Sequence, residues 1–138
     1  AVIKRHRDVQ SELDDQLVFQ RALIDAMPDP VFVRDLEGRL ILCNKSYEEA
    51  LSLRFEQVQG CRLIEVDALP RATAATLHDE FMIQLRTRRT RFSKRRLQFN
   101  DGNREIYQWT VPFYSAKGEL RGLLGGWTDI TQREAEAG

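Results

Sequence analysis

The side chains in this sequence that could do chemistry are two histidines, His6 and His78, and two cysteines, Cys43 and Cys61. A catalytic site needs a nucleophile beside a base, or a cluster of metal ligands, and these four residues are spread along the chain without a clustered spacing. Acidic residues are numerous but fall on segments predicted to face solvent, and no glycine-rich phosphate-binding loop precedes a predicted helix. We therefore expect neither a metal site nor an enzyme.

His78 and Cys43 each leave a choice between two roles. A single histidine on a helix can be an axial ligand of haem, but we favour a histidine that makes an ordinary hydrogen bond. Cys43 is predicted on a strand beside Asn44, where a thiol could sense redox state. Against this, no cation is predicted close enough to lower its pKa, and free cysteine is mostly a small buried apolar residue. Two cysteines are too few for a disulfide framework, so both are expected to be thiols in a reducing compartment.

A run of basic residues between Arg86 and Arg96 is the one patch that suggests nucleic-acid binding. It spans the end of a predicted helix and a predicted strand, so its side chains would not form one face that fits a groove. Cations near the C-terminus of a helix are also stabilised by the helix dipole, and the formal net charge of the chain is zero. We interpret the run as a solvated or partner-binding surface and expect no nucleic-acid partner.

The elements that position these residues follow from the apolar periodicity and the turn residues. The 138 residues, 42% of them hydrophobic, fit one domain. We predict a helix over residues 1–27 that ends at two prolines, the domain itself over residues 28–131, and the start of an outgoing helix over residues 132–138. Within the domain, a strand hairpin is followed by short helical turns, a helix over residues 73–87 and three strands, the first two joined by a turn at residues 100–103.

The N-terminal helix carries apolar residues at alternating spacings of four and three, the pattern of a two-stranded coiled coil. We predict that this seam joins two copies of the chain and that its polar member, Gln20, helps to fix their register. Phe19 and Leu23 lie beside the seam and widen the apolar face, which leaves open an amphipathic helix that lies on its own domain. The predicted seam consists of Leu13, Leu17, Gln20 and Ile24.

The last predicted strand, within Gly122–Arg133, runs directly into the outgoing helix. Gly125 and Gly126 weaken a strand by losing side-chain packing, so their presence suggests the close approach of backbone or a ligand. Asp129 or Thr131 can cap the helix that follows. This arrangement suits a module that passes a state of its core to the next segment, although a plain terminal strand and helix would look similar.

Several short motifs resemble the PAS sensor family. They are Asp35-Leu36-Glu37-Gly38-Arg39 ahead of a strand that ends at Asn44, Asp101-Gly102 in a later hairpin, and Asp129-Ile130-Thr131 at the end. Met27-Pro28-Asp29-Pro30, Val33-Arg34-Asp35 and Leu42-Cys43-Asn44 are similar to the PAS domain that precedes the kinase in BvgS-type hybrid sensor kinases. The resemblance implies an α+β fold, with a five-stranded antiparallel sheet in the order 2-1-5-4-3, helices over one face and often a small-molecule cavity.

The resemblance also implies which residues form the cavity and which couple it to the flanking helices. Asp129 is expected to tie the end of the last strand to the outgoing helix and to pair with Arg133, while a simple N-cap without special coupling is the alternative. The expected coupling residues are Asn44, Asp129, Thr131 and Arg133. The cavity candidates are Phe32, Ile41, Cys43, Tyr47, Leu51, His78, Phe81, Trp109, Leu123 and Trp127.

No required cofactor is expected, and the identity of any ligand is left open. Light-sensing PAS relatives carry a reactive cysteine three residues after a glycine, whereas here Gly60 is followed at once by Cys61, and Leu63 holds the reactive position. The flavin-contacting glutamine of the last strand is also missing from this sequence. Neither flavin nor haem is therefore expected.

The function implied by the resemblance is that of a cytoplasmic module of an inner-membrane, two-component sensor histidine kinase. The module would act as a homodimer and relay conformational signals from an upstream membrane or periplasmic sensor segment to a kinase in the same chain, modulated by a small ligand or by redox state. Basic residues after an apolar stub at the start of the sequence fit the cytoplasmic end of a membrane helix. The alternative is a ligand-sensing PAS module of a transcription regulator or a cyclic-dinucleotide enzyme.

Overall fold

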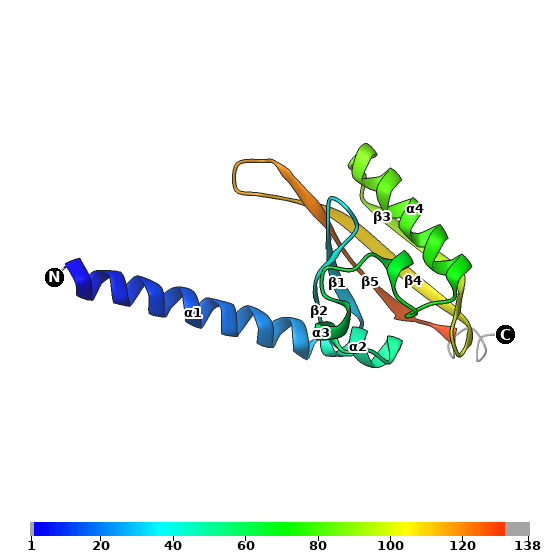
Figure 1. The fold of residues 1–138 in the computed structure, drawn as a ribbon, viewed down its shortest axis with the longest axis horizontal. Helices are drawn as coiled ribbons and strands as arrows, with labels where there is room; N and C mark the ends of the chain where they lie inside the picture. Colours follow the sequence, from blue (N-terminus) through cyan, green and yellow to red (C-terminus); the bar gives the residue numbers. More distant parts are fainter. Residues whose placement is uncertain (1, 132–138) are drawn as a thin grey trace.

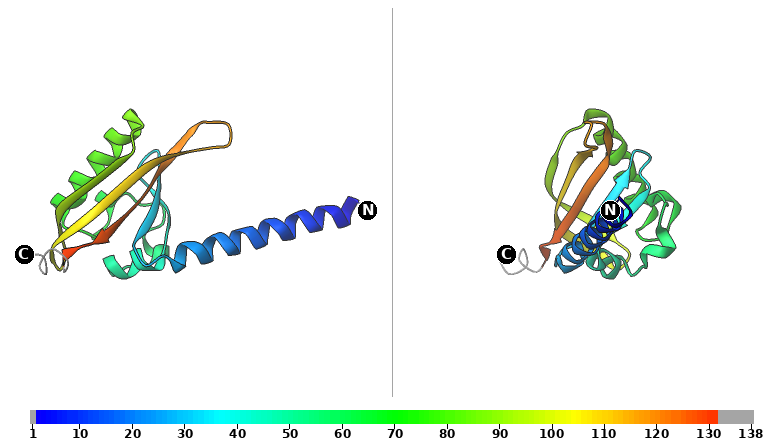
Figure 2. Two further views of the ribbon diagram at one scale, coloured as in Figure 1. Left: turned by 180° about the vertical axis from the view of Figure 1, so that it is seen from behind. Right: turned by 90° about the vertical axis from the view of Figure 1, so that its left-hand side faces the viewer.

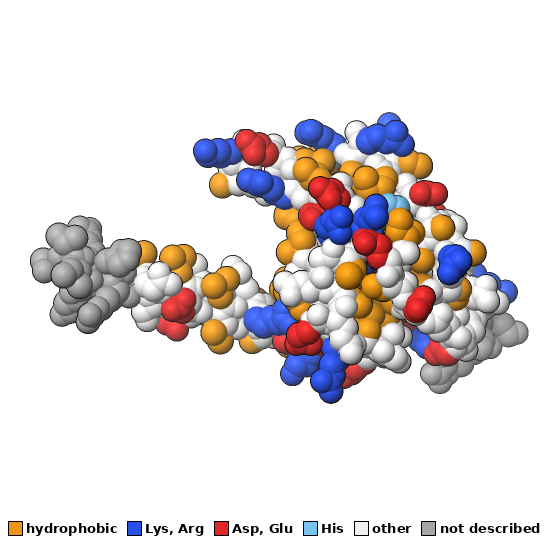
Figure 3. Space-filling model, viewed as in Figure 1, with side chains coloured by type: hydrophobic (Ala, Val, Ile, Leu, Met, Phe, Trp, Pro, Cys, Tyr) orange, Lys and Arg blue, Asp and Glu red, His pale blue; other side chains and the backbone are white. Residues whose placement is uncertain are grey.

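The computed structural model describes residues 2–131, with side chains from residue 9 onward. Helix α1 (Val2–Ala26) projects from one end of a domain that holds the remaining elements (Figure 1). Two further views show the same separation (Figure 2). Leu17 and Phe19 are each 64% exposed, and apolar side chains are visible along the free helix (Figure 3). The alternative of an amphipathic helix that lies on its own domain is therefore wrong.

Five antiparallel strands form one sheet in the order β2-β1-β5-β4-β3, which confirms the predicted topology. Strand β4 shows the period of two that produces such a sheet, because Ile106, Gln108 and Thr110 are buried while Tyr107 is exposed. The strands are β1 (Val31–Asp35), β2 (Leu40–Cys43), β3 (Arg91–Phe99), β4 (Gly102–Tyr114) and β5 (Leu120–Asp129).

Short helical segments and one longer helix, α4, cover one face of this sheet (Figure 1). Helix α4 buries Leu77, Phe81 and Leu85 along one stripe, as its sequence pattern predicts, and the core lies between this stripe and the sheet. The segments are α2 (Lys45–Leu51), α3 (Phe55–Val58), the 3₁₀ turn η1 (Leu63–Glu65) and α4 (Arg71–Thr87).

Gly125 and Gly126 let the middle of the sheet pack closely against its neighbours. A Cβ atom on Gly125 would lie 2.6 Å from Cζ of Phe32, and one on Gly126 would lie 2.6 Å from the carbonyl oxygen of Pro30. Both distances are well inside van der Waals contact, so no larger residue fits without a shift. The close approach predicted at these glycines is therefore made by an aromatic ring and by backbone.

Candidate functional site

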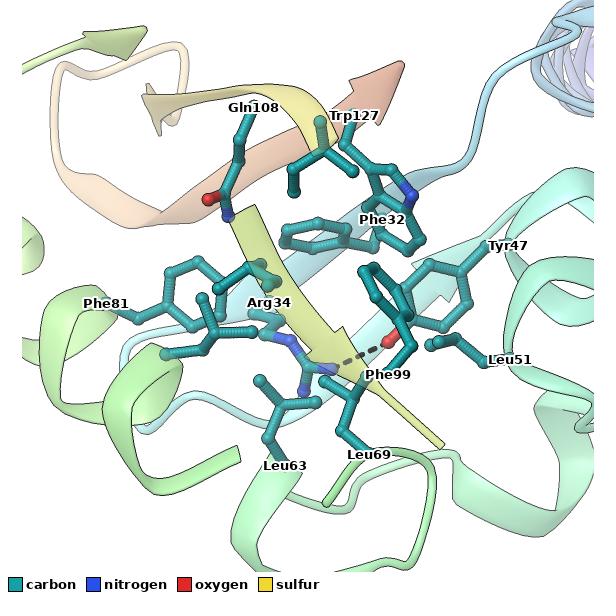
Figure 4. A pocket seen from close by; sticks show the side chains of 13 residues that line it. Phe32, Arg34, Tyr47, Leu51, Leu63, Leu69, Phe81, Phe99, Gln108 and Trp127 are labelled. Atoms are coloured by element: carbon teal, nitrogen blue, oxygen red, sulfur yellow. Dashed lines mark hydrogen bonds between the residues drawn. The ribbon is translucent and has the colours of Figure 1, made fainter. Parts of the chain in front are cut away.

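A small cavity lies in the core between the sheet and the helices (Figure 4). Its volume is about 30 Å³, close to the share of one water molecule in the liquid. The wall is almost entirely apolar, with three polar side chains among aromatic and aliphatic ones. The lining residues are Phe32, Arg34, Tyr47, Leu51, Leu63, Leu69, Leu77, Phe81, Leu97, Phe99, Ile106, Gln108 and Trp127.

Half of the predicted cavity residues lie in this wall. The structure brings together residues from β1, α2, α4 and β5, and their aromatic rings contact one another: the ring centroids of Phe32 and Phe81 are 5.6 Å apart, and those of Tyr47 and Trp127 are also 5.6 Å apart. Such tilted and edge-on pairs stabilise a core beyond the area they bury. The cavity candidates that lie in the wall are Phe32, Tyr47, Leu51, Phe81 and Trp127.

Two predicted cavity residues, Ile41 and Trp109, lie on the opposite face of the sheet, so their assignment was wrong. Side chains alternate between faces along a strand, and Leu40 takes the inward position beside Ile41, which is 46% exposed. Trp109 stands between the inward-facing Gln108 and Thr110. It lines a separate apolar depression of about 170 Å³ where the end of α1 meets the sheet.

Three more candidates are placed near the cavity but not in its wall. Cys43 and Leu123 are each 1% exposed and belong to the core cluster, yet neither lines the cavity. His78 is half-buried on α4 and packs on the turn before β2, where its Cε1 lies 3.0 Å from the position of a Cβ on Gly38. The assignment of these three side chains to the cavity wall is corrected accordingly.

The sequence interpretation missed the polar part of the wall, above all Arg34. This guanidinium is 4% exposed, and it lies 5.6 Å from the ring centroid of Phe32 and 6.0 Å from that of Phe81. Its Nη1 donates to the carbonyl oxygen of Gly38 at 3.0 Å, and its Nη2 donates to the hydroxyl of Tyr47 at 2.9 Å. The sequence did contain a sign that Arg34 faces inward. Arg34 is two residues beyond the inward-facing Phe32 on the same strand, and such residues share a face of the sheet.

Two titratable groups close to this arginine, Tyr47 and Cys43, stay protonated at neutral pH. Burial raises the pKa of the Tyr47 phenol, although the Arg34 guanidinium opposes the shift. Burial also raises the pKa of the Cys43 thiol to about 11, with a smaller contribution from the Glu48 carboxylate. The thiolate is the reactive form of cysteine, so the structure gives Cys43 the character of a buried apolar residue.

Asn44 joins α1 to the sheet and to α2, a set of contacts that we call the N-terminal junction. The side chain is fully buried, and its Oδ1 accepts from the backbone N–H of Val31 at 2.9 Å and of Tyr47 at 3.0 Å. Its Nδ2 donates to the carbonyl oxygens of Ile24 at 3.1 Å and Asp29 at 2.9 Å. The predicted helix cap is confirmed, and the same amide also holds the last turn of α1.

Asp129 organises the other end of the domain, a set of contacts that we call the C-terminal junction. One carboxylate oxygen accepts from the backbone N–H of Thr131 at 2.9 Å and from its hydroxyl at 2.6 Å, and the other accepts from Arg104 at 3.1 Å. Burial raises the pKa of Asp129, but the hydrogen bonds from Thr131 and Arg104 outweigh it and leave the pKa below its usual value. Arg133, the predicted partner of Asp129, lies outside the described residues.

One hydrogen bond links the N-terminal junction to the residue that precedes Asp129 of the C-terminal junction. The hydroxyl of Thr128, the residue before Asp129, donates to the carboxylate of Asp29 at 2.8 Å. Asp29 in turn accepts from Asn44 through its carbonyl oxygen. The segment that follows α1 is therefore bonded to the end of β5.

The basic run is tied to the domain by ion pairs. Arg95 contacts Glu80 at 2.6 Å, Arg91 contacts the same carboxylate at 3.3 Å, and Arg96 pairs with Glu105 at 2.8 Å. These pairs neutralise part of the charge that suggested a polyanion surface. No helix within residues 2–131 is both long and apolar enough to cross a membrane, and among the side chains described from residue 9 to residue 131 no three metal-ligating groups converge.

Comparison with known proteins points to one family. Residues 24–135 match the model of the PAS fold. The virulence sensor protein BvgS of Bordetella bronchiseptica is 38% identical over 95% of this chain, and the aerobic respiration control sensor protein ArcB of Escherichia coli is 28% identical over 88% of it. These matches span 11% of BvgS and 15% of ArcB, so the chain corresponds to a small part of each relative.

A solved structure agrees in both fold and extent. The PAS domain from Bordetella pertussis BvgS superposes with a TM-score of 0.77 at 38% identity, covering 89% of this chain and 92% of that one. The strand order found here, the helices over one face and the family match over most of the domain all agree with that likeness. This chain belongs to the PAS-fold family.

Proposed function

We propose that this chain is the signal-transmitting PAS module of a membrane-bound, two-component hybrid sensor histidine kinase. In this proposal the module is cytoplasmic, receives a conformational signal through α1 and passes it to a kinase that follows in the same chain. The similarity to the sensor proteins BvgS and ArcB supports a sensory context. The observation that carries the proposal is the hydrogen bond between Asp29 and Thr128, because it connects the segment that follows the incoming helix to the outgoing strand.

The exposure of α1 supports a homodimer as part of this proposal. The helix is 25 residues long and extends into solvent, and on the predicted seam Leu13 is 51% and Leu17 64% exposed. Most of the stability of a protein helix comes from packing its apolar face. A second copy of the same helix would bury this seam with the spacing that a coiled coil requires.

The relay is short in this arrangement. A displacement of the last turn of α1 acts on Asn44 through the carbonyl oxygen of Ile24. Asn44 is bonded to Asp29, and Asp29 to Thr128, which is next to Asp129 at the end of β5. A two-state change at either junction would therefore bias the other through bonded neighbours, which is the physical requirement for coupling.

The test uses the full-length protein that contains this module. Thr128→Val removes the hydroxyl while keeping a similar shape, and Thr128→Ser keeps the hydroxyl as the matched control. We expect the valine variant to lose most of the stimulus-dependent change in autophosphorylation and the serine variant to retain it. An unchanged response in the valine variant would refute the relay through this bond.

A further inference from the structure

The cavity contains a buried positive charge without a negative partner. A guanidinium group carries a positive charge, and no acidic residue occurs among the thirteen residues, Arg34 included, that line the cavity. The other ionisable side chain in the wall, Tyr47, has a pKa raised by burial and stays a neutral phenol. Buried charges in proteins are normally paired or bound to ions. The arrangement is therefore incomplete without an anion.

The guanidinium also has a donor that is not used. Its Nη atoms bond to Gly38 and Tyr47, and Nη1 approaches the carbonyl oxygen of Cys61 at 3.4 Å, but Nε has no hydrogen-bond acceptor among the described residues. A buried donor without an acceptor is rare in native structures. The faces of two aromatic rings stabilise the cation in part, but they do not satisfy the Nε–H.

Two other donors are present in the same wall. The Tyr47 hydroxyl accepts from Arg34, so its own proton is free to be donated to a third group. The side-chain amide of Gln108 lines the cavity from β4 and carries two N–H donors (Figure 4). Three donor groups and one positive charge thus surround a space of about 30 Å³.

We propose that this cavity binds one compact monovalent anion, the carboxylate group of a small organic acid or a halide ion, through Arg34, Tyr47 and Gln108. The size of the space limits the ligand to a group near the volume of one water molecule unless the wall moves. The binding does not rest on the proposed relay. The effect of the bound anion on the kinase does rest on the proposed relay, because the anion would contact Tyr47 of the N-terminal junction.

The direct test follows the Arg34 Nε–H resonance in ¹H–¹⁵N spectra of the 138-residue chain, dialysed into a buffer of low anion content. Sodium formate, acetate, butyrate and chloride are titrated separately, with acetamide as the neutral analogue of acetate. We expect formate, acetate or chloride to shift this resonance in a saturable manner and acetamide to leave it unchanged. A response to chloride alone identifies a halide site, and a stronger response to the short carboxylates identifies an organic acid.

Thermal unfolding in the same solutions separates binding from a general salt effect. At ten times its Kd, the anion should raise the Tm by about 3 to 8 °C. Arg34→Met keeps an apolar side chain of similar length without charge, and Tyr47→Phe removes only the hydroxyl. The rise in Tm should vanish in Arg34→Met and become smaller in Tyr47→Phe. If Arg34→Met does not fold, Tyr47→Phe alone provides the test.

Three results would overturn the proposal. They are no shift of the Nε–H resonance with any anion, an equal shift with acetamide and acetate, or an equal rise of Tm in wild type and in the variants. Because these measurements need no kinase, their failure leaves the proposed relay standing. Conversely, failure of the relay test does not bear on the anion site, which these spectra test independently.

Discussion

At the N-terminal junction a fully buried amide, Asn44, makes four neutral hydrogen bonds, whereas at the C-terminal junction an exposed carboxylate, Asp129, holds Arg104 and Thr131. Buried hydrogen bonds are costly to lose because the partner groups stay unsatisfied. Exposed ion pairs contribute little because water and salt screen them. The contacts of the N-terminal junction therefore hold one geometry, whereas the contacts of the C-terminal junction can be broken at a small cost in free energy.

The largest expected effect is at the N-terminal junction. Asn44→Ala leaves two backbone N–H donors and two carbonyl oxygens without their partner, and we expect it to lower the free energy of unfolding by about 3–5 kcal/mol. Urea denaturation measures this. Ser46→Ala is the control, since it removes one hydrogen bond, to the carbonyl oxygen of Pro28 at 2.8 Å, and should cost about 1 kcal/mol. If Asn44→Ala and Ser46→Ala lowered the free energy of unfolding equally, the contrast between buried and exposed contacts would be contradicted.

The next effect concerns the helix that leads into this junction. Leu13→Asp with Leu17→Asp places two charges on the predicted seam, and we expect dimer association to weaken by a factor of about 100 or more. Val18→Asp with Ala22→Asp is the matched control, because it has the same spacing and charge but lies off the seam. Sedimentation at low micromolar concentration measures both. A seam variant that stays dimeric would place the dimer contact elsewhere.

The smallest effect is at the C-terminal junction. Asp129→Asn should lower the free energy of unfolding by no more than about 1 kcal/mol at pH 7, because the pair with Arg104 is exposed. The pKa of Asp129 is depressed in the folded chain, so its contribution is present above the unfolded pKa and is lost as the pH falls through the lower, folded value. The gap in stability between wild type and variant should therefore begin to narrow as the pH falls below about 3.9, the unfolded pKa, and should close once the pH is below the lower, folded pKa.

Urea titrations of both proteins at pH 7 and at pH 3 check this prediction. The comparison between the junctions would fail if Asp129→Asn cost as much as Asn44→Ala. A gap between wild type and variant that does not narrow between pH 7 and pH 3 would show that the Asp129 charge is not its source.

The fold was predictable because its signals are local. Turn residues marked the hairpins of the sheet, and the apolar stripe of α4 indicated the face that it buries. It was harder to predict which side chains of each strand point toward the core. β2 is four apolar residues, Leu40–Cys43, and a fully apolar run does not show which face is inward. Ile41 was assigned to the wrong face for this reason.

Strand β4 misled the interpretation through its buried polar residues. Trp109 was assigned to the inward face, but its neighbours Gln108 and Thr110 face the core instead. Thr110 is satisfied there by Gln84 of α4, with a hydroxyl to amide-oxygen distance of 2.6 Å. That bond joins residues far apart in the sequence, so local periodicity gave no sign of it. Arg34 differs, because its position two residues beyond Phe32 on the same strand did predict an inward side chain.

The junctions show the same limit. Asn44 was predictable as a helix cap from its neighbours, but its bonds to Ile24 and Asp29 depend on where α1 ends relative to the sheet. The bond between Asp29 and Thr128 joins two ends of the domain. Its existence follows from the pairing of β1 with β5 and not from either segment alone.

The central claim is that the two junctions are energetically coupled through Asp29 and Thr128, and a double-mutant cycle on this pair tests it most directly. The free energy of unfolding is measured for wild type, Asp29→Ala, Thr128→Val and the double variant. Because a hydrogen bond to a charged group contributes about 1.5–3 kcal/mol, we expect a coupling free energy of about 1 kcal/mol or more after solvent screening of this partly buried pair. Additivity within about 0.3 kcal/mol would contradict the claim.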